Sequence, residues 1–267
     1  TMKLGVPPDW NKPIARDYYY RRLVMLKEKM EALTGNTITD DRLRTAVGTM
    51  NRIRDLLSRI GDLRKEDRPP IRGCDYIRLE HLSFFIDDDL LIPQLENLYE
   101  SLRLSDSPVS GKEPRILLAG NVIASGDYVV PDLIESSGAL IVAEFMDRGH
   151  RYRQWQVEAE GDLLSNICDT YYLHRVPSTV FQPAWEERLN HLEELIDTYR
   201  IDAVVWYQLA FDEIHNMEYA VVAKELGKRN LPVLKLESAY EYTREAMGPL
   251  TTRIESFISS IGQRGAH

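Results

Sequence analysis

The stretch Gly120-Asn-Val-Ile-Ala-Ser-Gly-Asp-Tyr-Val-Val-Pro-Asp-Leu-Ile-Glu135 identifies the fold of this chain, because of what surrounds it. An apolar run, Ile116-Leu-Leu-Ala119, comes directly before it. The stretch leads into an amphipathic segment that stops at Gly138. A second apolar run, Ala139-Leu-Ile-Val-Ala143, follows. This order predicts a strand, a loop, a helix and a parallel strand. Open α/β sheets bind ligands where their strands end, so the loop that begins at Gly120 is the first place to expect a site.

The part of the chain before this unit has a helical period. Residues 14 to about 105 carry apolar side chains at spacings typical of amphipathic helices. The first stripe ends at Gly35 and consists of Tyr18, Leu23, Leu26, Met30 and Leu33. The second begins after a predicted cap at Thr39 and consists of Leu43, Val47, Met50, Ile53, Leu57 and Ile60. We expect both stripes to pack in the core.

Beyond a boundary rich in Pro, Ser and Gly at residues 105–114, strand and helix patterns alternate. Strands are predicted at residues 115–119, 139–144, 202–207 and 232–236. Helices are predicted at residues 130–137, 162–175, 184–200, 215–229 and 248–261. Such alternation implies a parallel sheet with helices on both faces, here a flavodoxin-like or half-Rossmann layer of about four strands. The predicted fold is therefore α/β, with a helical region at residues 1–110 and an α/β domain at residues 111–267.

Composition narrows the class of protein. With 267 residues, 43% of them hydrophobic, the chain is long enough for a sizeable core. No apolar run approaches the roughly 20 residues that cross a bilayer, and the first residues do not form a signal peptide. Two cysteines, Cys74 and Cys168, argue against a disulfide framework, so we expect a cytoplasmic protein. A net charge of -9 makes nucleic acid an unexpected partner.

Three loops at the predicted strand ends carry the residues that could do chemistry. The first contains Gly120, Asn121 and Ser125. Its backbone N–H groups and the following helix could bind a substrate phosphate, although the loop has no nucleotide-binding motif and an ordinary βα turn would look the same. We treat these three residues as candidate substrate contacts.

The second loop, Met146-Asp-Arg-Gly-His-Arg-Tyr-Arg153, is basic. Three arginines could meet phosphate or carboxylate groups of a ligand: Arg148, Arg151 and Arg153. Their charges disfavour the protonated form of His150, which suits an acid–base role. The alternative is a solvated basic loop whose charges pair with nearby acidic side chains.

The third loop contains Asp212, Glu213 and His215 after the third predicted strand. These side chains could form a carboxylate–histidine pair or bind a metal, with His215 as a catalytic candidate. They could equally cap the helix that follows, since acidic residues are favoured at its positive end. We predict no metal site, because no H-E-x-x-H or C-x-x-C pattern occurs.

Several segments, in order, resemble the 2-hydroxyacyl-CoA dehydratase / benzoyl-CoA reductase subunit family. They are Leu26-Lys-Glu-Lys-Met-Glu-Ala-Leu-Thr-Gly35, Ile38-Thr-Asp-Asp-Arg-Leu-Arg44, the Gly120 loop, Leu231-Pro-Val-Leu-Lys-Leu-Glu237 and Thr252-Arg-Ile-Glu-Ser-Phe257. The resemblance implies an anaerobic heterodimer in which an iron–sulfur cluster passes one electron to a CoA thioester. It also implies an ATP-dependent activator protein that delivers the electron. Family members are usually longer, so the chain corresponds to their helical and C-terminal portions.

The chain departs from this family at the expected cluster cysteines. Met146 or a neighbour stands in the loop after the second strand, and Ala210-Phe-Asp212 replaces a cysteine-containing loop after the third. The segment Val176-Pro-Ser178 likewise lacks a cysteine. Since a four-iron cluster requires anionic sulfur ligands, we expect this chain to bind no [4Fe-4S] cluster and a homologous partner subunit to carry it.

Two alternatives remain at this level. The chain could be a non-catalytic scaffold or assembly relative of the family, because fold and chemistry are separable. It could also be a flavodoxin-like protein that binds a small anion or a nucleotide.

Overall fold

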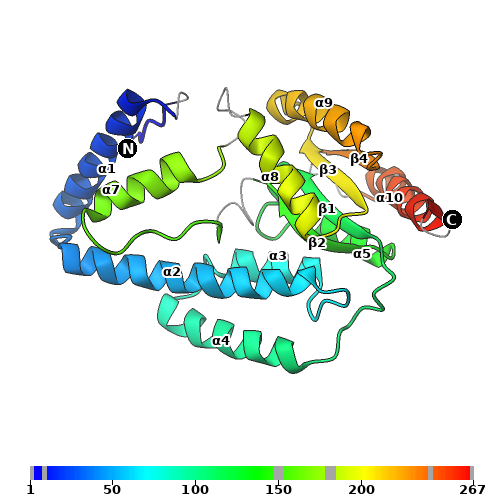
Figure 1. The fold of residues 1–267 in the computed structure, drawn as a ribbon, viewed down its shortest axis with the longest axis horizontal. Helices are drawn as coiled ribbons and strands as arrows, with labels where there is room; N and C mark the ends of the chain where they lie inside the picture. Colours follow the sequence, from blue (N-terminus) through cyan, green and yellow to red (C-terminus); the bar gives the residue numbers. More distant parts are fainter. Residues whose placement is uncertain (1–2, 8–10, 147–152, 178–184, 240–242, 265–267) are drawn as a thin grey trace.

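The computed structural model describes residues 3–7, 11–146, 153–177, 185–239 and 243–264 (Figure 1). Among these residues, no helix combines the length and the apolar character that crossing a membrane would require. Figure 1 shows two parts, with long helices on the left and below and a parallel sheet on the right. The arrangement confirms the predicted α/β fold with an N-terminal helical region.

The first part is built from α1 (Pro13–Thr34), α2 (Asp40–Asp62), the short 3-10 helix η1 (Leu63–Lys65), α3 (Gly73–Leu82) and α4 (Asp88–Leu104). Thr39 caps α2, since its side chain accepts a hydrogen bond from Arg42 N, as the sequence predicts. The α2 stripe is largely buried and packs against α3 and α4, through residues that include Ile53, Leu57, Ile60, Tyr76, Leu91 and Leu95.

The stripe predicted for α1 is mostly not in the core, so that expectation is wrong. Of its five members only Leu23 is buried, and Leu33 is 78% exposed. Helical spacing identifies which side chains share a face, but it cannot say whether another element covers that face. The elements packed against α1 are α7 (Leu163–Cys168) and η2 (Asp169–His174), which cover only part of it.

Four parallel strands form the sheet, in the order β2 (Leu140–Phe145), β1 (Arg115–Gly120), β3 (Ala203–Leu209) and β4 (Val233–Ser238). Alternate residues of each strand face opposite sides, so the sheet has two apolar layers. One layer is covered by α3, α5 (Val129–Ser136) and α10 (Arg244–Arg264). The other is covered by α8 (Trp185–Thr198) and α9 (Glu213–Lys228). All four predicted strands exist, with ends shifted by one or two residues.

One predicted helix changes character along its length. Residues 163–168 are α-helical, but Asp169–His174 form a π-helix. This segment follows β2 in the chain yet packs against α1, where Arg16 Nε donates to Asp169 Oδ1 at 2.8 Å. The helical part of the molecule therefore contains residues from both sides of the sequence boundary at residues 105–114, and the division at residues 110 and 111 stays a prediction.

Helix α3 connects the two parts. Its first two backbone N–H groups, on Gly73 and Cys74, donate to the carboxylate of Glu135 at 2.9 and 3.3 Å. The same buried carboxylate accepts from Ile141 N, at the start of β2, at 3.1 Å. A side chain at Gly73 would overlap the backbone of Ile141, so glycine permits this close approach. The start of α3 is thereby fixed onto the sheet.

Candidate functional site at the carboxyl edge of the sheet

The strand order creates one crevice position at the sheet edge. The chain moves from β1 to β2 on one side, then returns past β1 to β3 on the other. The loops after β1 and β3 therefore diverge at the position where open α/β sheets bind ligands. Gly120 ends β1 with φ +101°, and a Cβ there would overlap the carbonyl oxygen of Tyr207. Asn121 N donates to that same oxygen at 2.8 Å, which holds the start of the first loop against β3.

Three predicted site residues meet here: Asn121 from the first loop, and Asp212 and His215 from the third. Asp212 Oδ2 accepts from Asn121 Nδ2 at 2.6 Å and pairs with His215 Nδ1 at 2.8 Å. Asp212 Oδ1 accepts from the backbone N–H of His215 at 3.1 Å, which caps α9. The capping interpretation and the carboxylate–histidine interpretation are therefore both confirmed as geometry, because the two carboxylate oxygens serve different partners.

The pair sets the orientation of the imidazole. An ionised carboxylate only accepts hydrogen bonds, so His215 Nδ1 carries the proton that points to Asp212. The remaining ring nitrogen, Nε2, is then left as an acceptor when the ring is neutral. The side chain of His215 is 14% exposed.

The neighbouring strand ends add two further polar groups. Gln208 Nε2 donates to Glu237 Oε2 at 3.2 Å, joining β3 to β4. Among the described residues, Gln208 Oε1 is buried without a hydrogen-bond partner. Ser125, the remaining candidate in the first loop, lies exposed on that loop.

Sequence inspection missed a histidine that the tertiary structure brings to the same edge. His81, near the end of α3, is buried with its Nδ1 3.1 Å from the hydroxyl of Tyr128, which follows the Gly120 loop. Arg78 lies over the Tyr128 ring at 4.8 Å and pairs with Asp132 at 2.7 Å. No sequence signal marks His81, because α3 is distant in the chain and its helical period fits ordinary packing.

The basic loop falls only partly within the described residues. Arg148, His150 and Arg151 lie outside them, so their predicted roles stay predictions. Arg153 is described and is buried, with its Nε 2.7 Å from Glu80 Oε1. Its guanidinium also lies over the Tyr76 ring at 4.8 Å. The structure thus places this arginine between the helices rather than at the surface.

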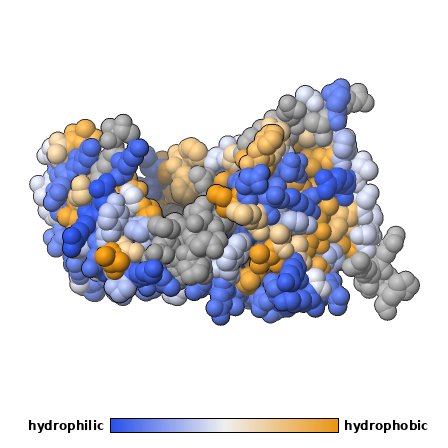
Figure 2. Space-filling model, turned by 90° about the horizontal axis from the view of Figure 1, so that it is seen from above, coloured by the Kyte–Doolittle hydropathy of each residue, from blue (hydrophilic) through white to orange (hydrophobic). Residues whose placement is uncertain are grey.

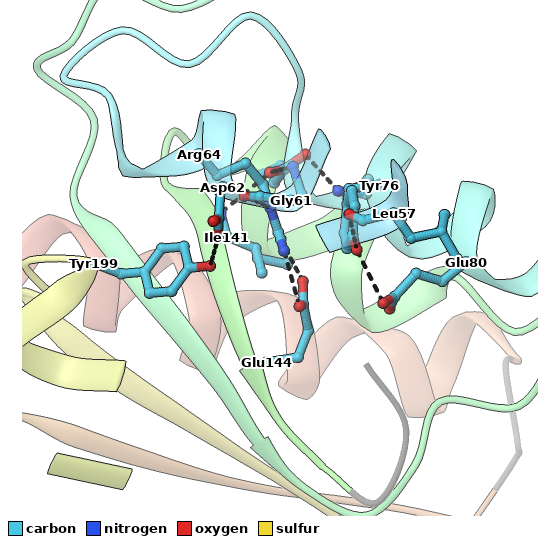
Figure 3. Close-up of polar contacts among 12 residues, drawn as sticks. Leu57, Gly61, Asp62, Arg64, Tyr76, Glu80, Ile141, Glu144 and Tyr199 are labelled. Carbon is cyan, nitrogen blue, oxygen red and sulfur yellow. Dashed lines mark hydrogen bonds and ion pairs between the residues drawn. The ribbon is translucent and has the colours of Figure 1, made fainter. Parts of the chain in front are cut away.

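Arg153 belongs to a buried charge cluster, which we define as Arg64, Tyr76, Glu80, Glu144 and Arg153. Figure 3 shows the first four of these residues. Arg64 makes a bidentate ion pair with Glu144, the penultimate residue of β2. Tyr76 donates to Glu80 at 3.0 Å. Burial alone would lower the pKa of Arg64, but the carboxylate of Glu144 outweighs it and raises that pKa. Burial raises the pKa of the Glu80 carboxyl, against the opposing effect of Arg153. Two arginines and two acidic side chains thus lie together, buried, beside β2.

The two cysteines lie on different helices, and both are buried. Cys74 lies in α3, where burial and then the carboxylate of Glu135 raise the pKa of its thiol. Cys168 ends α7 beside α1, and burial raises its pKa to about 11. Cluster iron binds thiolates grouped around one centre, whereas these thiols are buried on different parts of the fold. Within the described ranges, no three His, Cys, Asp or Glu side chains converge as metal ligands.

A second hollow exists away from the sheet edge. A polar cavity of about 460 Å³ lies between α2 and η2 and is lined by residues that include Asn51, Glu158, Asn166, Asp169 and His174. Asn51 and Asn166 donate to backbone carbonyls of the 157–160 segment, and Asp169 is paired with Arg16. The two asparagines thus hold the 157–160 segment in place, and Asp169 holds α1. Figure 2 also shows the surface hollowed between the part with α1 and the part with the sheet.

Comparison with known proteins places this chain in a family. A family model described as 2-hydroxyglutaryl-CoA dehydratase, D-component, matches residues 2–261. YjiM of Escherichia coli (strain K12), provisionally named as a dehydratase subunit, is 24% identical over 262 residues, covering 97% of this chain and 67% of the relative. A subunit of the benzoyl-CoA reductase of Thauera aromatica is 22% identical over 258 residues, covering 96% of this chain and 66% of the relative.

A third relative gives the same match. The (R)-phenyllactyl-CoA dehydratase beta subunit of Clostridium sporogenes is 19% identical over 252 residues, covering 92% of this chain and 66% of the relative. The chain therefore spans about two thirds of the length of each of these proteins. With the family model matched over nearly all of its residues, the chain belongs to the 2-hydroxyacyl-CoA dehydratase / benzoyl-CoA reductase subunit family.

Proposed function

We propose that this chain is a subunit of a complex that acts on a CoA thioester by one-electron chemistry, and that its sheet edge forms part of the acyl-CoA site. The observation that carries the proposal is the hydrogen-bonded group of Asn121, Asp212 and His215 at the switch point. Relatives named for benzoyl-CoA and phenyllactyl-CoA support the substrate class. Either dehydration or reduction of such a thioester moves protons, which a positioned histidine can supply.

The geometry supports a proposed role for each residue. His215 exchanges a proton through Nε2, and Asp212 holds the ring by its Nδ1 proton. Gly120 and Asn121 line the crevice beside it, with Ser125 further along the same loop. Arg148, His150 and Arg151 would bind phosphate or carboxylate groups or carry a proton, as the sequence predicts. Arg153 is left out of the ligand contacts, since it is buried against Glu80.

The electron is assigned to another polypeptide. We place the [4Fe-4S] cluster on a homologous partner subunit and its reduction on an ATP-dependent activator protein. The separate, buried positions of Cys74 and Cys168 support this assignment. Anaerobic purification should give iron and acid-labile sulfide in the complex but not in this chain alone. Stoichiometric iron on the isolated chain, lost when both cysteines are replaced, would contradict it.

The catalytic part of the proposal is tested by His215→Gln in the complex with its partner. Positioned acid–base groups typically contribute about 10²–10⁴-fold, so we expect a loss of rate in that range with subunit assembly unchanged. His174→Gln is the matched control, because His174 is an exposed histidine in the helical part. An unchanged rate for His215→Gln would instead favour a scaffold role for this chain.

A further inference from the structure

The loop after β3 holds a phenylalanine in an arrangement that the fold does not require. Phe211 is 97% exposed, and its backbone has φ +67°. This left-handed conformation is uncommon for a bulky residue, and such backbone outliers cluster at functional positions. The loop is held on both sides by backbone hydrogen bonds. Ala210 N donates to Ser238 O at 2.9 Å, and Asp212 N donates to Leu209 O at 3.2 Å.

Helix capping does not explain this residue. Phe211 precedes Asp212, the N-cap of α9, and an apolar side chain at that position commonly packs against the fourth helical residue. Here the fourth residue is Asn216, whose side-chain oxygen accepts from Lys235 Nζ at 2.6 Å. The nearly complete exposure of Phe211 confirms that its ring does not pack against Asn216 or Lys235.

Two apolar side chains continue from Phe211 along the first turns of α9. Ile214 and Met217 follow at intervals of three residues and are 39% and 61% exposed. Ile214 and Met217 therefore share one face of α9, and Phe211 lies just before the helix begins. We name Phe211, Ile214 and Met217 the apolar rim. Its members flank Asp212 and His215 in the chain, so exposed apolar side chains lie around the start of α9, near the polar pair.

We propose that the apolar rim binds the acyl group of the thioester and favours an aryl or bulky alkyl group over a short one. This inference rests on the proposed function. The thioester carbonyl of an acyl-CoA is polar, and an aryl or alkyl acyl group is apolar. These two parts match the polar side chain of His215 and the apolar rim. A ligand ring gains contact with the Phe211 ring and with the polarisable sulfur of Met217.

The test measures equilibrium binding of benzoyl-CoA and acetyl-CoA to the complex of the 267-residue chain with its partner subunit. Phe211→Ser removes the ring, and Phe211→Tyr keeps it. We expect Phe211→Ser to weaken benzoyl-CoA binding about tenfold and to leave acetyl-CoA binding within about twofold. Phe211→Tyr should match the wild type. Leu104→Ser, an exposed apolar residue at the end of α4, is the control for loss of surface hydrophobicity.

Failure of the rim and failure of the proposed function give different results. If the wild type binds neither thioester, the proposed function itself fails. If it binds both, and Phe211→Ser changes neither or weakens both equally, only the rim inference is overturned. Loss of co-purification with the partner, at unchanged benzoyl-CoA affinity, would make the rim an interface between subunits and likewise overturn it.

Discussion

Single residues fix the geometry of the sheet edge, and Gly120 is the clearest case. It combines φ +101° with a backbone so close to Tyr207 that a Cβ cannot fit. We expect Gly120→Ala to lower the free energy of unfolding by roughly 2–4 kcal/mol. Gly126→Ala is the matched control: its φ is +96°, but nothing lies within 4 Å of where its Cβ would stand, so the loss should be about 1 kcal/mol. Equal losses in urea unfolding would contradict the steric argument.

Asp212 has two tasks that substitutions can separate. Asparagine is also a good N-cap, so Asp212→Asn should change the free energy of unfolding by less than about 0.5 kcal/mol. Asp212→Ala removes the cap and should cost about 1 kcal/mol, measured by chemical denaturation. In the complex, both variants should reduce the rate, because neither supplies the carboxylate that orients His215. A fully active Asp212→Asn variant would show that the rate does not depend on the carboxylate and that capping, which asparagine also provides, is the main task of this side chain.

Tyr199 gives a pH dependence of stability. Burial raises its pKa to about 12, whereas the unfolded chain ionises tyrosine near about 10. The stabilisation is complete below about pH 10 and is lost as pH rises toward about 12, because only the unfolded state releases the proton. At about pH 11 the wild type should have lost about 1 kcal/mol more than Tyr199→Phe, relative to about pH 8. Parallel urea curves for both proteins across this range would contradict the assignment.

At the scale of elements, α3 depends on a carboxylate from another helix. Glu135 accepts hydrogen bonds from Gly73 N, Cys74 N and Ile141 N. Glu135→Gln replaces one acceptor by an NH2 group that faces a donor, so we expect a loss of about 1–3 kcal/mol. Faster amide exchange at Gly73 and Ile141 should accompany it. Glu28→Gln, on the exposed side of α1, is the control and should be neutral.

Element boundaries were largely predictable, because strands and helices obey local periods. The four strands and the α2 stripe follow directly from apolar spacing. The exposed α1 stripe and the π-helical turn at residues 169–174 do not, since both depend on what packs against them. Local sequence specifies which side chains share a face, and tertiary contacts decide which face is covered.

At the scale of the whole molecule, the buried charge cluster joins the helical part to the sheet. Arg64→Met leaves Glu144 without its bidentate partner in a buried position, so we expect a loss of about 3–5 kcal/mol. The double variant Arg64→Met/Glu144→Leu removes both charges and should recover most of that loss, as measured by thermal and urea unfolding. A double variant as unstable as the single one would show that packing, rather than charge, dominates at this position.

The order of strands and helices, the loops where chemistry is expected, and the family can all be read from the amino-acid sequence alone. These features are written in local periodicity and in motif order, which need no knowledge of distant contacts. Three side-chain pairings needed the folded chain: Asp212 with Asn121, His81 with Tyr128, and Arg153 with Glu80. Each pairing joins residues far apart in the chain, and the partners are chosen by how the helices pack on the sheet rather than by spacing along it.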